Sequence, residues 1–330
     1  MKEILSTLFD NKTLSREVAK DILKNIASGK YNTSQVAAFM SVYLMRNITV
    51  QELSGFQEAM LDLCQHVKFD SPETIDIVGT GGDGKDTFNI STLACFITAG
   101  AGIKVTKHGN YGVSSVSGSS NVLEAIGYRF TNNQDILQKQ LDTANICFMH
   151  APLFHPAMKT VAPIRKELGV RTFFNILGPI VNPCFPKYKL IGVYNLEMAR
   201  LYNYLLQNTS SEYTLLHSFD GYDEVSLTSD FKLISKHLER QVQPAELGFQ
   251  TVKQQELSGG ESVEESAKLF LNILNGQGTP AQNNVVAVNA AMAIHCVYPQ
   301  RNLFDCLAEA QESLHSKKAL HVFKQLLNNQ

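Results

Sequence analysis

The stretch IDIVGTGGD at residues 75–83 decides the fold class, because a short apolar run there passes directly into a glycine-rich loop. Glycine lets backbone N–H groups come close to an anion, and the start of a following helix leaves further N–H donors unpaired. Two more polar loops follow at short spacing, NIST at 89–92 and KHGN at 107–110. One glycine-rich loop is usually only a tight turn, but three such loops in close succession predict a site for a polyphosphate ligand.

Beyond this stretch, short β-type runs alternate with helical segments. The expected strands are 75–78, 103–106, 146–148, 190–193 and 213–216. The expected helices include 93–101, 122–126, 196–206, 281–296 and 303–327. Pro156 and Gly169 predict a further helix between them, since proline favours the first turn of a helix and glycine follows the last. The alternation predicts an α/β fold with a mainly parallel central sheet covered by helices.

Residues 1–68 contain helical patterns only. Thr49 and Glu52 have the spacing of a capping box, which satisfies two unpaired N–H groups at the start of a helix. The helix that follows carries one apolar stripe, formed by Leu53, Phe56, Met60, Leu63 and Val67. Helices this short cannot bury such stripes alone. The sequence therefore predicts a small helical domain over 1–68, which needs the rest of the chain or a second copy, and a larger α/β domain from residue 72.

Composition argues against several classes of protein. The chain has 330 residues, of which 44% are hydrophobic and 18% charged, as is ordinary for a globular enzyme. A formal net charge of −2 gives no case for a nucleic-acid or anionic-membrane partner. The apolar run at 93–103 is too short to span a bilayer and no signal-peptide pattern is visible, so the cytoplasm is the expected location. The six cysteines form no C-x-x-C pair, which favours buried reduced thiols over a catalytic thiol or a zinc site.

Two polar segments have both a structural and a functional interpretation. Asn89 and Ser91 are good N-cap residues for the apolar helix after them, and the same groups can present hydroxyls and N–H donors to a phosphate. The serine-rich segment 114–120 is typical of a flexible linker. It lies only a few residues after KHGN, however, which favours a second wall of donors around the same anion.

Asp223 and Glu224 are the clearest acidic candidates. They follow Gly221 and precede a strand-like run at 225–227, so the pair is expected at a turn before a strand. Taken alone, such a pair is usually solvated. Beside a polyphosphate site it suits Mg²⁺, which takes one or two carboxylates together with ligand phosphates.

The remaining candidates are weaker. His108, His150 and His155 have neither metal-ligand spacing nor a cysteine partner, and His150 and His155 are expected to be buried or at the rim of a site. Arg165 is a typical surface residue unless its helix faces a cleft, where its guanidinium can hold a carboxylate.

These motifs, in this order, resemble the anthranilate phosphoribosyltransferase family over nearly the whole chain. The matching segments are GTGGD at 79–83, NIST at 89–92, KHGN at 107–110, SS at 114–115, SGS at 117–119, VLEAIG at 122–127, HPAMK at 155–159, ELGVRT at 167–172, FNILGPIVNP at 174–183, Asp223-Glu224, PAELG at 244–248 and NAA at 289–291. Several of these segments are weak individually, but their shared order and spacing are not expected by chance.

The resemblance implies an enzyme of tryptophan biosynthesis that transfers the 5-phosphoribosyl group from phosphoribosyl pyrophosphate to anthranilate and releases pyrophosphate. The residues implied to bind phosphoribosyl pyrophosphate are Gly79, Gly82, Asp83, Thr87, Asn89, Ile90, Ser91, Thr92, Lys107, His108, Gly109, Asn110, Ser114, Ser115 and Ser119. Mg²⁺, with two ions per subunit, is implied at Ser91, Asp223 and Glu224. Anthranilate is implied at Gly79, Asn110 and Arg165. The chemistry demands no strong general base, because the amine nitrogen already has a lone pair, and none is assigned.

The same resemblance implies that residues near 165–185 return to the helical domain. That leaves 72–164 and 186–330 as the phosphoribosyl-pyrophosphate-binding domain, of the nucleoside phosphorylase and phosphoribosyltransferase type. A homodimer formed through the helical part is also implied.

Three positions depart from the family pattern. Tyr111 stands where many members have arginine, Asn121 where many have aspartate, and Phe154 within the segment where many carry N-H-H-P. The first two lie at the edges of the phosphate loops and bear on donor affinity, whereas the third bears on the route of the acceptor.

Two other functions share part of this pattern. A pyrimidine nucleoside phosphorylase has the same fold type and a glycine-rich phosphate loop, but it binds inorganic phosphate and a nucleoside and needs no acidic metal pair. A non-enzymatic relative that binds nucleic acid should carry a basic groove, which a net charge of −2 and intact phosphate loops do not favour.

Overall fold

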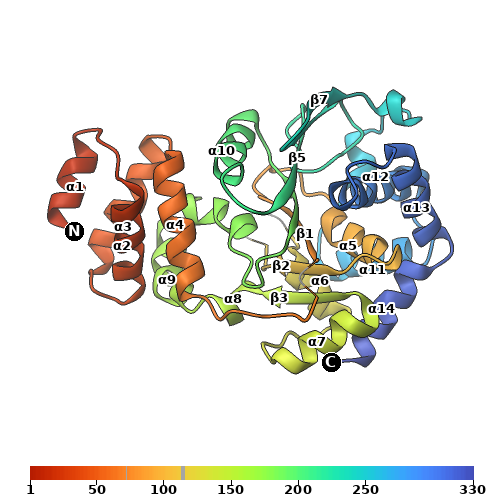
Figure 1. The fold of residues 1–330 in the computed structure, drawn as a ribbon, viewed down its shortest axis with the longest axis horizontal. Coiled ribbons are helices and arrows are strands. Elements are labelled where there is room, and N and C mark those ends of the chain that lie inside the picture. Colours follow the sequence, from red (N-terminus) through yellow and green to blue (C-terminus); the bar gives the residue numbers. More distant parts are fainter. Residues whose placement is uncertain (72, 113–115) are drawn as a thin grey trace. The chain divides into compact units, whose positions relative to one another are not determined.

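The computed structural model describes residues 1–71, 73–112 and 116–330, and it forms two compact units (Figure 1). Unit 1 consists of Met1–Val67 and Ala151–Phe185. Unit 2 consists of Lys68–His150 and Pro186–Gln330. Each unit is therefore built from two segments that are far apart in the chain. The return to unit 1 begins at residue 151, earlier than the boundary near 165 that the family resemblance implied.

Helices make up unit 1. They are α1 (Lys2–Phe9), α2 (Arg16–Ala27), α3 (Thr33–Met45), α4 (Val50–Leu63), α8 (Ala151–Phe154) and α9 (Ala157–Leu168), followed by the 3₁₀ turns η1 (Phe173–Ile176) and η2 (Gly178–Ile180). α9 packs against α2 and α3, which joins the return segment to the first four helices of this unit. The predicted capping box is confirmed, since the Thr49 hydroxyl accepts from the Glu52 N–H and the Glu52 carboxylate accepts from the Thr49 N–H.

A buried carboxylate and an aromatic stack hold unit 1 together. The Glu52 side chain is fully buried and accepts a hydrogen bond from the Arg46 guanidinium at 3.0 Å and from the Leu14 N–H at 3.1 Å. A buried charge is tolerated only when it is paired and hydrogen-bonded in this way. The rings of Phe56 and Phe173 stack with centroids 4.5 Å apart, which joins α4 to η1.

In its described residues, unit 2 contains one seven-stranded sheet with the order β3-β2-β1-β4-β5-β6-β7. The strands are β1 (Ile75–Gly79), β2 (Val105–Gly109), β3 (Ile146–His150), β4 (Tyr188–Gly192), β5 (Glu212–Ser218), β6 (Phe231–Ser235) and β7 (Glu239–Val242). Strands β1 to β5 run parallel, whereas β6 and β7 are antiparallel at one edge. The predicted α/β fold with a mainly parallel sheet is thus confirmed. The two antiparallel edge strands have no counterpart among the predicted strands.

Helices cover the sheet of unit 2. They are α5 (Ile90–Gly100), α6 (Ser119–Ala125), α7 (Gln134–Ala144), α10 (Leu196–Leu206), α11 (Val263–Leu274), α12 (Pro280–Val297), α13 (Leu303–His315) and α14 (Lys318–Asn328), with the 3₁₀ turns η3 (Pro244–Leu247) and η4 (Gln254–Leu257). α5 and α12 pack against each other and against strands of the sheet, while α10 and α12 lie on either side of β5 (Figure 1). The central strand β4 is consequently buried along its whole length, as expected for a parallel sheet covered on both faces.

Two predicted elements are wrong. The segment 303–327 is not one helix, because Lys317 takes a left-handed conformation with φ of 64° and separates α13 from α14. Residues 225–227 form no strand, because Leu227 has φ of 59°, which extended backbone does not allow. Leu227 is fully buried, so the apolar character that indicated a strand reflects packing in the core.

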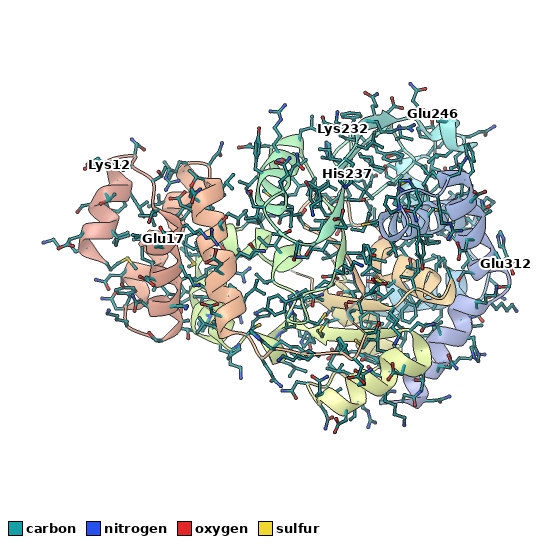
Figure 2. The ribbon with its side chains drawn as sticks, in the orientation of Figure 1. Lys12, Glu17, Lys232, His237, Glu246 and Glu312 are labelled. Atoms are coloured by element: carbon teal, nitrogen blue, oxygen red, sulfur yellow. The ribbon has the colours of Figure 1, made fainter. Side chains whose placement is uncertain are left out.

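Charged side chains lie mainly at the surface. Glu246 and Glu312 of unit 2 are exposed and point away from the ribbon (Figure 2). Lys107, Asp223 and Glu224 are exceptions, each less than a tenth exposed. Among the described residues, no helix has both the length and the apolar character needed to cross a membrane.

Candidate active site

The strand order places a topological switch between β1 and β4. β2 and β3 lie on one side of β1, and β4 and β5 on the other. In open α/β sheets, ligands bind beyond the carboxyl ends of the strands at such a point. β1 ends at Gly79 and β4 at Gly192, and these two residues pair in register. A methyl group on either glycine would overlap Asp223, so both glycines are needed to admit the acidic segment to this edge.

Three carboxylates meet at this edge. One oxygen each of Asp83, Asp223 and Glu224 lies within 4.8 Å of the other two. Asp223 Oδ2 accepts a hydrogen bond from the Gly81 N–H at 2.6 Å, and Glu224 Oε1 accepts one from the Thr87 hydroxyl at 2.9 Å. Asp223 and Glu224 are each only 8% exposed, so the interpretation of this pair as a solvated turn is wrong.

The three carboxylates disfavour one another's ionisation. Burial, followed by the charge of Asp83, raises the pKa of Asp223 to about 7. Burial and the charge of Asp223 raise the pKa of Glu224 well above its ordinary value, and burial raises the pKa of Asp83. Asp83 Oδ2 is shielded from solvent and accepts no hydrogen bond from the described residues. Hard oxygens crowded in this way fit a divalent cation such as Mg²⁺, whose charge favours the ionised form of all three.

Mg²⁺ should therefore raise the melting temperature more at about pH 8 than at about pH 5.5. Because the pKa of Asp223 rises to about 7 on folding, the folded protein keeps a proton that the unfolded chain releases between about pH 4 and pH 7. The resulting stability is fully present below about pH 4 and is lost by about pH 7, above which the ionised carboxylates repel one another most. Melting curves with and without Mg²⁺ at both pH values measure this. Equal Mg²⁺ shifts at the two pH values would contradict it.

Lys107 supplies a buried positive charge in the middle of β2. Its side chain is 2% exposed, and Nζ donates to the Ile77 carbonyl at 2.6 Å and to Ser91 Oγ at 3.5 Å. Its charge opposes the rise in the pKa of Glu224, so the ammonium acts on the acidic cluster. Lys107 and Ser91 were predicted separately from two motifs. They come together because α5, which carries Ser91, packs against β2, which carries Lys107.

The start of α5 lies beside these groups. Asn89 is the N-cap residue, but its side chain makes no capping hydrogen bond. Its Nδ2 instead donates to the Ser117 carbonyl at 3.1 Å, which ties two of the polar loops together. Asn89 thus occupies the predicted N-cap position, but its side chain binds another loop and does not cap the helix. The first turn of α5, formed by Ile90, Ser91 and Thr92, presents the positive end of the helix dipole at this edge.

The KHGN loop is tied to the start of α6. His108 and Gly109 are the last residues of β2, and a side chain at Gly109 would crowd the Ser119 hydroxyl. That hydroxyl donates to the Asn110 carbonyl at 3.2 Å. Asn110 Oδ1 accepts from the Tyr111 N–H at 2.8 Å, which holds the amide side chain against its own loop. The third loop is therefore joined to Ser119, at the start of α6.

The loop after β1 holds the other predicted phosphate-binding residues. Gly82 has φ of 82°, a conformation in which side chains are strained. Asp83 lies within the carboxylate cluster, and the Thr87 hydroxyl donates to Glu224. The sequence analysis placed both residues in the phosphate site and did not predict these contacts with the acidic segment. The carboxylate of Asp83 directly after the glycines was the available signal, but nothing local links it to residues 223–224. Ser114 and Ser115 lie outside the described residues.

Arg165, predicted for the acceptor, belongs to unit 1. It lies in the last turn of α9 and is half-buried. Its Nη2 donates to Asn175 Oδ1 at 3.2 Å, and its guanidinium lies 5.6 Å from the Phe174 ring centroid. Burial lowers its pKa. Both contacts are with uncharged groups, so the positive charge is not neutralised by either of them.

Comparison with known proteins gives full-length similarity. Residues 71–320 match the family described as "Glycosyl transferase family, a/b domain", and residues 2–64 match "Glycosyl transferase family, helical bundle domain". A Flavobacterium psychrophilum protein named anthranilate phosphoribosyltransferase is 57% identical over 326 residues, which cover 99% of this chain and 98% of that protein.

Solved structures share the fold. The crystal structure of anthranilate phosphoribosyltransferase from Thermus thermophilus has a TM-score of 0.91 and 29% identity, with 98% of both chains covered. The Saccharomyces cerevisiae protein of the same name, in complex with PRPP and Mg, has a TM-score of 0.91 and 26% identity, with 98% of this chain and 96% of that chain covered.

Proposed function

The chain belongs to the anthranilate phosphoribosyltransferase family, and from this premise we propose that the carboxyl edge of β1, β2 and β4 is its phosphoribosyl pyrophosphate site. The enzyme transfers the 5-phosphoribosyl group to anthranilate, releases pyrophosphate and forms N-(5-phosphoribosyl)anthranilate in tryptophan biosynthesis. The observation that carries the site proposal is the convergence of two buried carboxylates and the half-buried Asp83 with Lys107 at the topological switch. Anthranilate fluorescence should fall when phosphoribosyl pyrophosphate and Mg²⁺ are supplied.

The same assay separates this reaction from nucleoside phosphorolysis. The transferase releases one pyrophosphate for each anthranilate consumed, whereas a phosphorylase consumes inorganic phosphate. The buried acidic cluster supports the transferase, because phosphorolysis needs no metal-binding carboxylates. A rate that depends on phosphate and a nucleoside, without loss of anthranilate, would contradict the assignment.

The donor site is assigned to the loops that surround this edge. We propose that phosphoribosyl pyrophosphate is bound by Gly79, Gly82, Asp83, Thr87, Asn89, Ile90, Ser91, Thr92, Lys107, His108, Gly109, Asn110, Ser114, Ser115 and Ser119. The glycine-rich loop and the first turn of α5 offer backbone N–H groups, which are suited to phosphate oxygens. Lys107 adds a full positive charge that burial keeps unscreened by water.

Mg²⁺ is proposed at Asp223, Glu224 and Ser91, with two ions per subunit. The short separations within the carboxylate cluster support the first two ligands and add Asp83 to the proposal. Ser91 Oγ contacts Lys107 Nζ in this structure. When bound, Mg²⁺ supplies positive charge that neutralises pyrophosphate as a leaving group.

Residues of the chain act on both the attacking amine and the leaving pyrophosphate. The amine nitrogen attacks C1 of the ribose, the bond from C1 to the pyrophosphate oxygen breaks, and the nitrogen then loses a proton. Lys107 and the backbone N–H groups stabilise the negative charge that grows on the leaving oxygen. Holding both substrates at one site aligns the nitrogen with C1. No residue has to act as a strong base, because the attacking nitrogen is uncharged and carries a lone pair.

Arg165→Ala should raise the anthranilate KM by about tenfold or more and leave the phosphoribosyl pyrophosphate KM nearly unchanged. We propose that the guanidinium binds the anthranilate carboxylate, while Gly79 and Asn110 orient the ring. Its loss removes a charge-assisted bond of about 1.5–3 kcal/mol. Steady-state kinetics with each substrate varied in turn measures both constants. Arg200→Ala, at an exposed arginine of α10, serves as the control. Equal shifts in the two constants would make Arg165 structural.

Unit 1 is proposed as the dimer-forming helical domain, and unit 2 as the donor-binding domain. Leu53, Phe56 and Met60 are buried inside unit 1, so this stripe serves the core and does not supply the contact predicted for it. Phe9 and Met45, at the ends of α1 and α3, are 63% and 87% exposed and offer apolar surface instead.

The predicted cytoplasmic location stays a prediction.

Sedimentation at micromolar concentration should give about twice the 36.6 kDa mass of the chain. Met45→Glu should shift the protein toward monomer, because it places a charge on the proposed apolar contact. Leu238→Glu, at an exposed leucine of unit 2, is the matched control. A wild-type chain that sediments as a monomer would contradict the proposal.

A further inference from the structure

The backbone that carries Asp223 and Glu224 has no regular secondary structure of its own. Residues 221–227 belong to neither a helix nor a strand. The three crowded carboxylates repel one another whenever they are ionised, which pushes this segment away from the loop after β1. Something outside the segment must therefore hold the two ligands in place.

The side chain of Asn289, on α12, forms hydrogen bonds with both the N–H and the carbonyl of Val225, the residue that follows Glu224. Its Oδ1 accepts from the Val225 N–H at 3.1 Å, and its Nδ2 donates to the Val225 carbonyl at 2.8 Å. The second proton of Nδ2 goes to the Val285 carbonyl of α12, also at 2.8 Å. One side chain thus does for Val225 what a neighbouring strand does in a sheet, and ties it to a helix.

The position of Asn289 is unusual for a polar residue. It is 3% exposed and lies among buried alanine and valine side chains on α12. A buried amide is costly unless its hydrogen bonds are made, and here they are made to the acidic segment and to α12 itself. An apolar residue would fill the same space without fixing any backbone. Asparagine therefore differs from an apolar residue at this position by the hydrogen bonds that it forms with Val225.

Ser218 holds the other side of the same segment. This last residue of β5 is fully buried, and its hydroxyl donates to the Glu224 carbonyl at 2.6 Å. Its N–H donates to the Tyr222 carbonyl at 3.2 Å. The carbonyl of Glu224 and both backbone groups of Val225 are consequently held by side chains from two different elements, β5 and α12.

We infer that Asn289 and Ser218 are positioning residues that set the cation affinity of the carboxylate cluster through the backbone of Asp223 and Glu224. This inference rests on the proposed metal site. Groups that orient ligands without touching the ion typically change metal affinity by about 10–100-fold when they are lost. Asn289→Ala should therefore weaken binding within that range, because both backbone groups of Val225 lose their partner. Ser218→Ala should weaken it less. It releases the Glu224 carbonyl and the N–H and hydroxyl of Ser226, but it leaves both backbone groups of Val225 bound to Asn289.

Binding of Mn²⁺ alone, followed by the electron paramagnetic resonance signal of the free ion, tests this without relying on turnover. Val288→Ala is the matched control, since Val288 is the adjacent fully buried residue of α12 and makes no polar contact with the acidic segment. Asn289→Ala should lose Mn²⁺ affinity at unchanged anthranilate KM, whereas Val288→Ala should lower only the melting temperature. If Asn289→Ala does not fold, Ser218→Ala carries the test.

The Asp223→Asn variant distinguishes a failure of the proposed metal site from a failure of the proposed positioning role of Asn289 and Ser218. Unchanged Mn²⁺ affinity in that variant would mean that the proposed metal site is wrong. Reduced affinity in Asp223→Asn, but wild-type affinity in folded Asn289→Ala and Ser218→Ala, would overturn the positioning inference alone. An equal loss in Val288→Ala would also overturn it, because the effect would then be one of general stability.

Discussion

Replacing Asp223 by Asn together with Glu224 by Gln is expected to lower turnover at low Mg²⁺ on the order of 10³-fold without lowering stability. The swap keeps side-chain volume and hydrogen-bonding capacity but removes two negative charges, so both cation affinity and leaving-group neutralisation should fall. A 10³-fold loss corresponds to about 4 kcal/mol in the barrier. The raised pKa of Asp223 shows that burial and Asp83 disfavour its charge, so removing that charge should leave the melting temperature near pH 8 unchanged or higher.

The measurement is the steady-state rate as a function of Mg²⁺ concentration for both proteins, with melting curves recorded in parallel. Glu264→Gln makes the same chemical change at an exposed residue of α11 and should leave the rate within a factor of about two. A double variant with the wild-type rate and Mg²⁺ dependence would show that Asp223 and Glu224 do not bind the metal.

The second large effect is expected for Lys107→Met, which should lower kcat/KM for phosphoribosyl pyrophosphate by about 10²–10³-fold. Methionine has a similar length and keeps the packing of the buried stem, but it removes the ammonium that reaches Ser91 and acts on Glu224. A positive charge in a site shielded from water stabilises the leaving group far more than an exposed one, and loss of one such group typically costs about 2.7–4 kcal/mol.

Lys104→Met is the matched control, because Lys104 precedes the same strand by one residue and forms an exposed ion pair with Asp142. Exposed pairs of this kind contribute about 0–1 kcal/mol, so kcat/KM should hardly change. If Lys107→Met folds and retains kcat/KM within about threefold, then the ammonium serves mainly to bind the Ile77 carbonyl and the proposed role in leaving-group stabilisation is wrong.

Much of the fold was predictable because its signals are local. The glycine-rich loop begins at the last residue of β1, KHGN overlaps the end of β2, and the helix predicted over 196–206 has the observed bounds of α10. The parallel sheet could be predicted from the alternation of elements, since parallel strands need a crossover between them. The failed strand at 225–227 shows the limit of such signals. Its apolar residues are buried, but Leu227 has a left-handed backbone that no periodicity indicates.

By itself, the sequence determined which chemical groups are available: glycine-rich and polar loops whose donors suit an anion, one lysine among them, and an acidic pair at a turn. Tertiary structure alone decided that these groups form one site, since 142 residues separate Gly81 from the Asp223 carboxylate that it binds. The in-register pairing of β1 with β4 sets Gly79 beside Gly192, and the two glycines leave room for the acidic segment. The high pKa of Asp223 also depends on the tertiary structure, because the carboxylate loses its hydration when the chain closes around it and then lies beside the charge of Asp83.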